Sequence, residues 1–194
     1  MFKRFFKKQG LLSIILALPF LGMTLGIAPL QAASKPAQEF VVQDQKQLDI
    51  LASLMVERME LAKDSAVYKW NQTLPIDEFE NEQVFLTQIS EKITNLDPKI
   101  VNSFFKAQIE TAKMINIENF ETWVNENVHK HHYTPDPIAL QKKLQDIDEK
   151  LIVALKDAYA MLSGPQSQVF KVELAKILQD KGFSRDVIDS ATHF

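Results

Sequence analysis

The longest uninterrupted helical pattern in the chain is the feature that most constrains its fold. From about Asp44 to Gln72 the apolar residues recur with the period of an α-helix, and no glycine or proline interrupts the run. Arg58 and Lys69 share the apolar stripe, because eleven steps of about 100° return almost to the starting direction, about 16 Å further along the axis. The stripe comprises Leu48, Leu51, Met55, Arg58, Ala62, Ala66 and Lys69.

Two cations on an inward face are unfavourable for stability alone. A buried charge without a partner costs several kcal/mol, so Arg58 and Lys69 each require a negative charge nearby. An anionic guest held inside a helical bundle would supply it. The stripe therefore suggests a site for an organic anion.

Helical patterns separated by capping and breaking residues continue to the end of the chain. Asp77 with Glu80 resembles the start of a second helix, and Asp97 with Pro98 the start of a third. An irregular stretch over 125–137 is followed by helical patterns that end at Gly164, at residue 182 and near the last residues. Strand alternation and internal repeats are absent from the sequence. We predict an all-α fold, a single-domain bundle of five to six helices over residues 44–194.

The first 32 residues have the layout of a cleavable export signal. Basic residues at the start precede an apolar run over 11–27, and small residues stand at Ala32 and Ala33. We expect cleavage after Ala32, then a polar leader over 33–43, and a periplasmic or secreted protein. The alternative, a retained membrane anchor, is disfavoured by helix-disturbing residues, so we expect no stable membrane insertion after cleavage. These residues are Pro19, Gly22, Gly26 and Pro29.

Charge and cysteine content exclude several classes of function. Removing residues 1–32 takes away four basic residues and no acidic ones, so the formal charge of −3 falls to −7. An acidic exported protein is a poor candidate for binding nucleic acid or an anionic membrane. Cysteine is absent, which excludes disulfides and a lipid attachment site, so stability must come from the hydrophobic core.

The sequence gives little support for metal binding, phosphate binding or nucleophilic catalysis. His129, His131 and His132 form a cluster, but two imidazoles four residues apart on a helix and a motif-placed acidic ligand are both missing. A solvated loop is the simpler interpretation, and we predict neither a metal nor a cofactor. The sequence also has no recognisable nucleophile motif or glycine-rich phosphate loop.

Two sets of polar residues adjoin predicted apolar faces. Glu82 lies near apolar residues of the second helix, whereas most other carboxylates are typical of a solvated helix surface or of caps. Gln108, Ala112 and Asn116 follow one another at four-residue spacing beside the inner face of the third helix. A polar amide there is either a satisfied core group or a ligand contact, and the pattern does not decide between them.

Two longer runs carry a family resemblance. VERMELAKDSAVYKWNQTLPIDEFENEQVFL and LDPKIVNSFFKAQIETAKMIN resemble the secreted, γ-type branch of the all-helical chorismate mutases. The similarity covers about Leu48 to Trp123, with IDEKLIVAL similar to a later helix of the family. The export signal also fits that branch. The resemblance implies a chorismate mutase type II-like fold.

The resemblance also implies an activity. The family converts chorismate to prephenate by an intramolecular pericyclic rearrangement, a step of aromatic amino-acid biosynthesis (the shikimate pathway), without a cofactor. Its substrate is a small dianion, and negative charge accumulates on the ether oxygen as the C–O bond breaks. Fixed cations and donors stabilise that charge, and the site selects a compact conformer that is minor in water.

Residue roles carried over by position form the predicted catalytic set. Arg58 corresponds to an arginine that clamps a substrate carboxylate, and Lys69 to a lysine that contacts the ether oxygen and a carboxylate. Glu82 corresponds to a glutamate that accepts from the substrate hydroxyl, and Glu78 to an acidic position one turn earlier. Asn116 stands where the family usually has Gln or Glu directed at the ether oxygen, and it is one methylene shorter than Gln.

Two expected arginines are absent, which weakens the implied activity or changes the substrate. Asn81 and Leu144 stand at their positions. Nearby lysines could compensate, although lysine is not equivalent to arginine in a bidentate carboxylate clamp. The predicted substrate-binding residues are Glu78, Asn81, Ala112, Lys113, Lys142 and Lys143.

Three hypotheses follow from these observations. The first is an exported chorismate mutase, for which the family suggests a homodimer. The second is a non-catalytic or repurposed protein that uses the same scaffold to bind a small carboxylate. The third is a helical protein in which Arg58 and Lys69 merely pair with Glu82 and Glu110.

Overall fold

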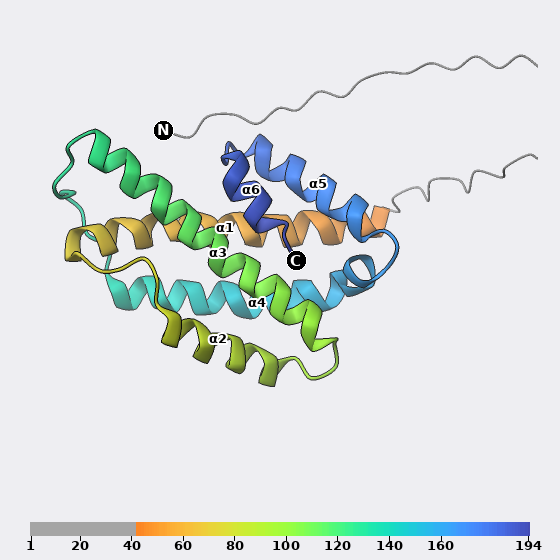
Figure 1. Cartoon of the computed structure of the whole chain (residues 1–194). Coiled ribbons are helices and arrows are strands. Elements are labelled where there is room, and N and C mark those ends of the chain that lie inside the picture. Colours follow the sequence, from red (N-terminus) through yellow and green to blue (C-terminus); the bar gives the residue numbers. More distant parts are fainter. Residues whose placement is uncertain (1–41) are drawn as a thin grey trace, which may run out of the picture. The chain divides into compact units, whose positions relative to one another are not determined.

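A computed structural model describes residues 42–194, so the predicted signal peptide and most of the predicted leader lie outside the described residues. The described residues form six α-helices, as predicted (Figure 1). Their bounds are α1 Val42–Gln72, α2 Phe79–Lys92, α3 Pro98–Asn125, α4 Pro137–Ser163, α5 Ser167–Asp180 and α6 Arg185–Ala191. Within residues 42–194 there is no β-strand, which confirms the all-α prediction. None of the described helices is long and apolar enough to cross a membrane.

Helix boundaries follow local capping chemistry at three starts. Asp97 accepts a hydrogen bond from the backbone N–H of Lys99, and Asp136 accepts one from Ile138, each with a proline in the first helical turn. Ser184 accepts from the N–H of Val187 at the start of α6. These side chains satisfy backbone donors that a helix start leaves unpaired, so the helices begin where they do.

The predicted cap of the second helix is wrong. The helix begins after Glu78, and no side chain caps its first turn by the expected Asp77 arrangement. Instead, the backbone N–H of Glu78 donates to Oε1 of Glu82 at 3.2 Å, while Asp77 forms an ion pair with Lys113. A long-range ion pair therefore uses the carboxylate that the sequence pattern assigned to the helix start.

The core lies where α1 packs against α3 and α4, with α5 and α6 closing one side. Figure 1 shows α3 crossing α1 obliquely, with α4 running beside α1 and α2 at the edge of the bundle. Burying these apolar side chains is the main favourable term in folding. The largest fully buried apolar side chains are Phe104, Phe105, Phe170, Leu48, Leu51, Met55, Ile93, Leu151, Leu155, Leu174 and Leu178.

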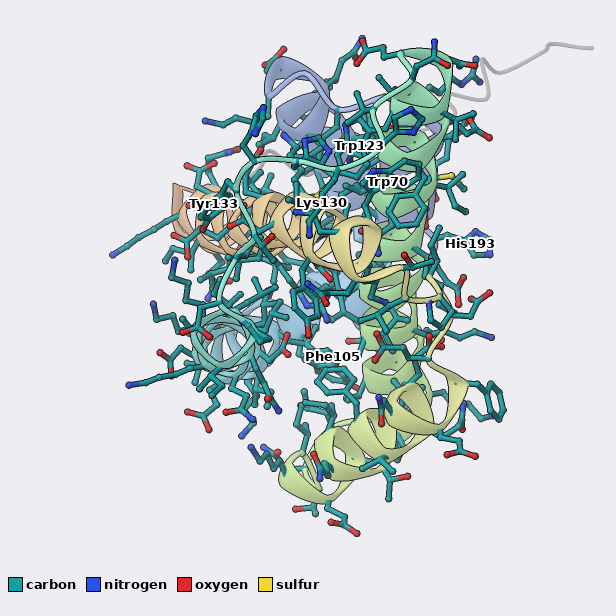
Figure 2. All side chains as sticks on the ribbon, turned by 90° about the vertical axis from the view of Figure 1, so that its left-hand side faces the viewer. Trp70, Phe105, Trp123, Lys130, Tyr133 and His193 are labelled. Atoms are coloured by element: carbon teal, nitrogen blue, oxygen red, sulfur yellow. The ribbon has the colours of Figure 1, made fainter. Side chains whose placement is uncertain are left out.

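One asparagine fixes the longest connection, which joins α3 to α4. The side-chain amide of Asn71 donates to the carbonyl oxygens of His131 and Tyr133 and to Oγ1 of Thr134, and its oxygen accepts from the N–H of His131. Trp123 packs against the His131 ring, with 4.2 Å between ring centroids. Figure 2 shows Trp123 beside this connection. These contacts attach the connection to the end of α1.

The histidine cluster of this connection shows no metal-ligating arrangement. His131 belongs to the aromatic contacts just described, and residues 42–194 contain no group of three His, Cys, Asp or Glu side chains placed to hold an ion. The absence of a metal stays a prediction.

Candidate functional site

Eight of the ten predicted site residues line one cavity of about 220 Å³, which we call the Lys69 cavity. It lies between the C-terminal half of α1, the start of α2 and the middle of α3. The helical period of α1 places Arg58 and Lys69 on the same side, and α3 contributes residues one turn apart. The predicted residues in the lining are Arg58, Lys69, Glu78, Asn81, Glu82, Ala112, Lys113 and Asn116.

The other two predicted residues, Lys142 and Lys143, do not line the Lys69 cavity. Both side chains are exposed on α4, and Lys143 lines a separate hollow with Glu57 and Lys150. Leu144 faces inward, and residues one and two positions before it point about 100° and 200° away from that direction. The lining of the Lys69 and Asp148 cavities therefore gives no support to a substrate-binding role for Lys142 or Lys143.

A second cavity of about 830 Å³, the Asp148 cavity, adjoins the first. Arg58, Glu78, Asn81 and Phe85 line both cavities, so they form a shared wall. The Asp148 cavity extends between α1, α2 and α4 and reaches Leu144. The two positions where the sequence resemblance expects arginines, Asn81 and Leu144, thus lie on its lining.

Arg58 is the most buried cation of the site. Its side chain is about one-tenth exposed, and its Nε donates to Oδ1 of Asp148 at 2.8 Å. Its Nη1 donates to the backbone carbonyl of Gln108 at 2.9 Å, and its guanidinium carbon lies 6.0 Å from the centre of the Phe85 ring. The guanidinium is therefore fixed from three helices before any ligand binds.

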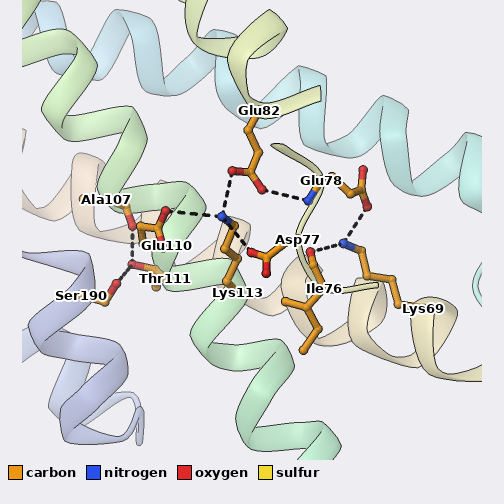
Figure 3. A network of polar contacts seen from close by, with 10 residues as sticks. All are labelled: Lys69, Ile76, Asp77, Glu78, Glu82, Ala107, Glu110, Thr111, Lys113 and Ser190. Atoms are coloured by element: carbon orange, nitrogen blue, oxygen red, sulfur yellow. Dashed lines mark hydrogen bonds and ion pairs between the residues drawn. The ribbon is translucent and has the colours of Figure 1, made fainter. Parts of the chain in front are cut away.

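Lys69 is fixed by the connection between α1 and α2. Its Nζ lies 2.6 Å from Oε1 of Glu78 and donates to the carbonyl oxygen of Ile76 at 2.8 Å (Figure 3). Burial alone would raise the pKa of Glu78, but hydrogen bonds from Lys69 and Asn81 and the Lys69 charge lower this pKa below its ordinary value of 4.5. Glu78 is therefore held in its ionised form beside the ammonium.

Lys113 lies among three carboxylates. Its Nζ is 2.8 Å from Glu82, 3.2 Å from Asp77 and 3.5 Å from Glu110 (Figure 3). Burial by itself would lower the pKa of Lys113, but the hydrogen bonds to Glu82 and Asp77 raise it well above its usual range. The lysine stays charged, and Glu82 is ion-paired instead of standing free in the cavity.

These contacts correct one expectation and one alternative. The inward cations do not lack partners, because protein carboxylates neutralise each of them. The alternative in which Glu82 and Glu110 pair with Arg58 and Lys69 names the wrong partners, since both of these carboxylates pair with Lys113. Buried cations require counter-charges, and α4 and the α1–α2 connection supply them.

Asn116 belongs to the lining of the Lys69 cavity. Its side chain is 4% exposed, and its Oδ1 is buried without a hydrogen-bond partner among the described residues. An unpaired buried oxygen is costly. Asn116 is therefore not a fully satisfied core amide, and its contact with a ligand stays a prediction.

The polar residues that sequence reasoning missed include Ser65 in the Lys69 cavity and Asp148 in the Asp148 cavity. Ser65 lines the Lys69 cavity, seven residues after Arg58 and four before Lys69, so its helical position was a usable signal. Asp148 lies four residues after Leu144 on the inner face of α4, and the same reasoning would have found it. The position of each residue in the sequence does not indicate which residue its side chain contacts, because these contacts depend on how separate helices pack.

Comparisons with known proteins give a consistent assignment of the fold. No family model matches the chain. The chain is 25% identical over 121 residues to the secreted chorismate mutase of Mycobacterium tuberculosis, a match that spans 61% of this chain and 61% of that protein. Chorismate mutase from Burkholderia thailandensis superposes with a TM-score of 0.68 at 24% identity, covering 76% of this chain and 98% of the solved one. The fold is that of the chorismate mutases.

A second solved structure agrees. Chorismate mutase from Burkholderia phymatum gives the same TM-score of 0.68 at 14% identity, covering 76% of this chain and 94% of that structure. The resemblance to the all-helical chorismate mutases seen in the sequence is confirmed. Within this chorismate mutase fold, the Lys69 and Asp148 cavities lie side by side between α1, α2 and the helices α3 and α4.

Proposed function

We propose that the chain is an exported chorismate mutase that converts chorismate to prephenate in the Lys69 cavity. The observation that carries the proposal is the convergence of Arg58, Lys69 and Asn116 on one cavity inside a chorismate mutase fold. The two cations are preorganised by hydrogen bonds, as electrostatic stabilisation of a developing oxyanion requires. The rearrangement needs no further chemical group.

Each lining residue has a proposed role. Arg58 binds one substrate carboxylate with the terminal donors that its protein partners leave free. Lys69 donates to the ether oxygen and to a carboxylate, and Asn116 contacts the same oxygen through its amide nitrogen. Glu82 accepts from the substrate hydroxyl. Holding the substrate between these groups selects the compact conformer that reacts.

The missing arginines set the expected rate. One charge-assisted contact contributes about 1.5 to 3 kcal/mol, so losing the two contacts at Asn81 and Leu144 costs about two to four orders of magnitude in transition-state binding. We therefore expect a slow enzyme. Lys113 supplies a replacement charge at the lining, although three carboxylates share it.

The test is turnover of chorismate by the exported and processed protein. Prephenate formation, followed by nuclear magnetic resonance, should exceed the uncatalysed rate and should be lost in Lys69→Ala and Arg58→Ala. A protein that folds but leaves chorismate to rearrange at its uncatalysed rate would exclude the enzymatic proposal.

A second candidate is a binding protein that holds a small carboxylate without turnover. The observation that favours it is the carboxylate partner at each of Arg58, Lys69 and Lys113, which reduces the positive field that a dianion meets. It predicts thermal stabilisation by small carboxylates without product formation. The turnover experiment separates the two candidates.

Export and assembly complete the proposal. We propose that residues 1–32 direct export to the periplasm or medium and are removed after Ala32, so the mature protein begins at Ala33. Intact mass measurement of the exported protein tests the cleavage site. We also propose a homodimer, in line with exposed apolar side chains such as Ile138 and Val153 on α4, and sedimentation measurements test it.

A further inference from the structure

The buried carboxylate of Asp148 is the feature of the site that the proposed reaction leaves unexplained. Asp148 is 9% exposed within the long helix α4, and its Oδ1 accepts from Nε of Arg58 at 2.8 Å. Both residues line the Asp148 cavity. A negative charge thus lies in direct contact with the arginine proposed to bind a negatively charged substrate.

The contact leaves Arg58 able to bind a ligand. Of its three nitrogens, Nε is bonded to Asp148 and Nη1 to the carbonyl of Gln108, while Nη2 has no hydrogen-bond partner among residues 44–194. Arg58 lines both cavities, so an anion in either one can reach the remaining donors. Asp148 therefore acts on ligand binding through charge without blocking the guanidinium.

The two adjoining cavities carry as many carboxylates as cations. Their lining has four cationic side chains and four acidic ones, so the pair of cavities is formally neutral before a ligand enters. The cations are Arg58, Lys69, Lys92 and Lys113, and the acids are Glu78, Glu82, Asp148 and Glu149. A dianion entering this lining meets less attraction than the number of cations alone implies.

Asp148 is more buried than Glu78 and Glu149, and it differs from the similarly buried Glu82 in pairing with Arg58 and not with Lys113. The side chain of Glu149 is 69% exposed, so water and salt screen its charge. Glu78 and Glu82 belong to the start of α2, at the edge of the bundle. The side chain of Asp148 is only 12% exposed and is fixed within α4, so its charge acts at low screening.

We propose that Asp148 is a specificity-determining residue of this site, whose carboxylate offsets the charge of Arg58 and lowers the affinity of the site for dianions. This inference rests on the proposed function. It predicts that one negative charge that is present weakens dianion binding, in addition to the two arginines that are absent.

The experiment compares Asp148→Asn with the unmodified protein. Asparagine keeps an oxygen that accepts from Nε of Arg58 but removes the charge, so the KM for chorismate should fall, on the order of tenfold, with kcat little changed. Asp146→Asn is the matched control, because Asp146 is exposed on the same helix and lines a different hollow. Its KM should stay within about twofold of the unmodified value, since exposed charges are screened.

The opposite result would identify a different role. If Asp148 mainly holds Arg58 in position, Asp148→Asn raises KM or lowers kcat, and the proposal is overturned. An unchanged KM overturns it as well.

A second variant keeps the proposal testable if Asp148→Asn fails to fold. Asp148→Ser also removes the negative charge from the lining of the Asp148 cavity, and its hydroxyl oxygen is still a hydrogen-bond acceptor. The proposal predicts a lower KM. An unchanged or higher KM contradicts it.

Failure of the proposed function gives a separate result. If the unmodified protein does not convert chorismate, the dissociation constant for chorismate, measured by titration calorimetry, replaces KM. Asp148→Asn should then bind chorismate on the order of tenfold more tightly than the unmodified protein. Equal or weaker binding by this variant would refute the role of Asp148 independently of catalysis.

Discussion

The ammonium of Lys69 lies 2.6 Å from the carboxylate of Glu78, and this ion pair joins the last turn of α1 to the residue before α2. Lys69 also donates to the carbonyl oxygen of Ile76 in the same connection. The lysine is therefore held at the wall of its cavity by a short segment at the bundle edge. Its role in chemistry and its role in structure can be separated by substitution.

Lys69→Ala should remove activity while leaving the fold intact. Loss of one preorganised donor typically costs at least about 100-fold in rate, and Glu78 can reach solvent when its partner is removed. Initial rates and thermal unfolding by circular dichroism measure the two effects. Lys63→Ala is the control, since Lys63 is an exposed lysine of the same helix, and it should retain the rate. Loss of the fold in Lys69→Ala would instead indicate a mainly structural lysine.

Glu78 should make a pH-dependent contribution to stability. Because the pKa of Glu78 is lowered in the folded protein, its contribution is present above the ordinary value of 4.5 and is lost as pH falls through the lowered value. Urea unfolding of the unmodified protein and of Glu78→Gln should therefore give free energies that differ at neutral pH and converge in acid. Glu80→Gln is the control, as Glu80 is exposed and has no ion pair within residues 44–194. If the difference between the two free energies of unfolding grows as the pH falls, the pKa of Glu78 is not lowered in the folded protein.

Asn81→Arg should raise activity. Asn81 lies on the wall shared by both cavities, and its exposed side chain leaves room for a longer one. A guanidinium there adds a charge-assisted contact to a substrate carboxylate, so kcat/KM should rise about tenfold or more. Gln83→Arg adds the same charge to an exposed position of α2 outside both cavities and should have little effect. No gain in Asn81→Arg would mean that other cations already hold the carboxylate.

Asn71→Ala should loosen the connection between α3 and α4. The four hydrogen bonds of the Asn71 side chain hold this connection, and their loss should lower the free energy of unfolding by about 2 kcal/mol. Limited proteolysis should also cut faster within residues 126–136. Gln72→Ala, at an exposed neighbouring position, should change neither quantity by much. Equal behaviour of the two variants would show that the aromatic packing of Trp123 fixes the connection by itself.

The sequence predicted the parts of this structure that depend on one helix at a time. The stripe of α1 is buried as expected from Leu48 to Ala66, and Asp97 caps α3 as its side chain and the following proline indicate. Eight of the predicted residues line one cavity, because helical period and family resemblance select the same helix faces. Local chemistry and periodicity are enough for such features.

Pairings between separate helices could not be predicted in the same way. Arg58 and Asp148 are 90 positions apart, and nothing in either segment indicates that they meet. Asp77 has the sequence context of a cap but pairs with Lys113, because the tertiary fold brings a buried ammonium within reach. Lys142 does not line either cavity for a related reason, since closeness in sequence to Leu144 does not give the same direction on a helix.

A crystal structure with a stable analogue of the rearrangement's transition state tests the central claim most directly. The account predicts one analogue molecule in the Lys69 cavity, with one carboxylate on Arg58 and with the ether oxygen and the remaining carboxylate in contact with Lys69 and Asn116. An analogue bound only in the groove between α3, α5 and α6, or a Lys69 cavity that stays without analogue at saturating concentration, would contradict it.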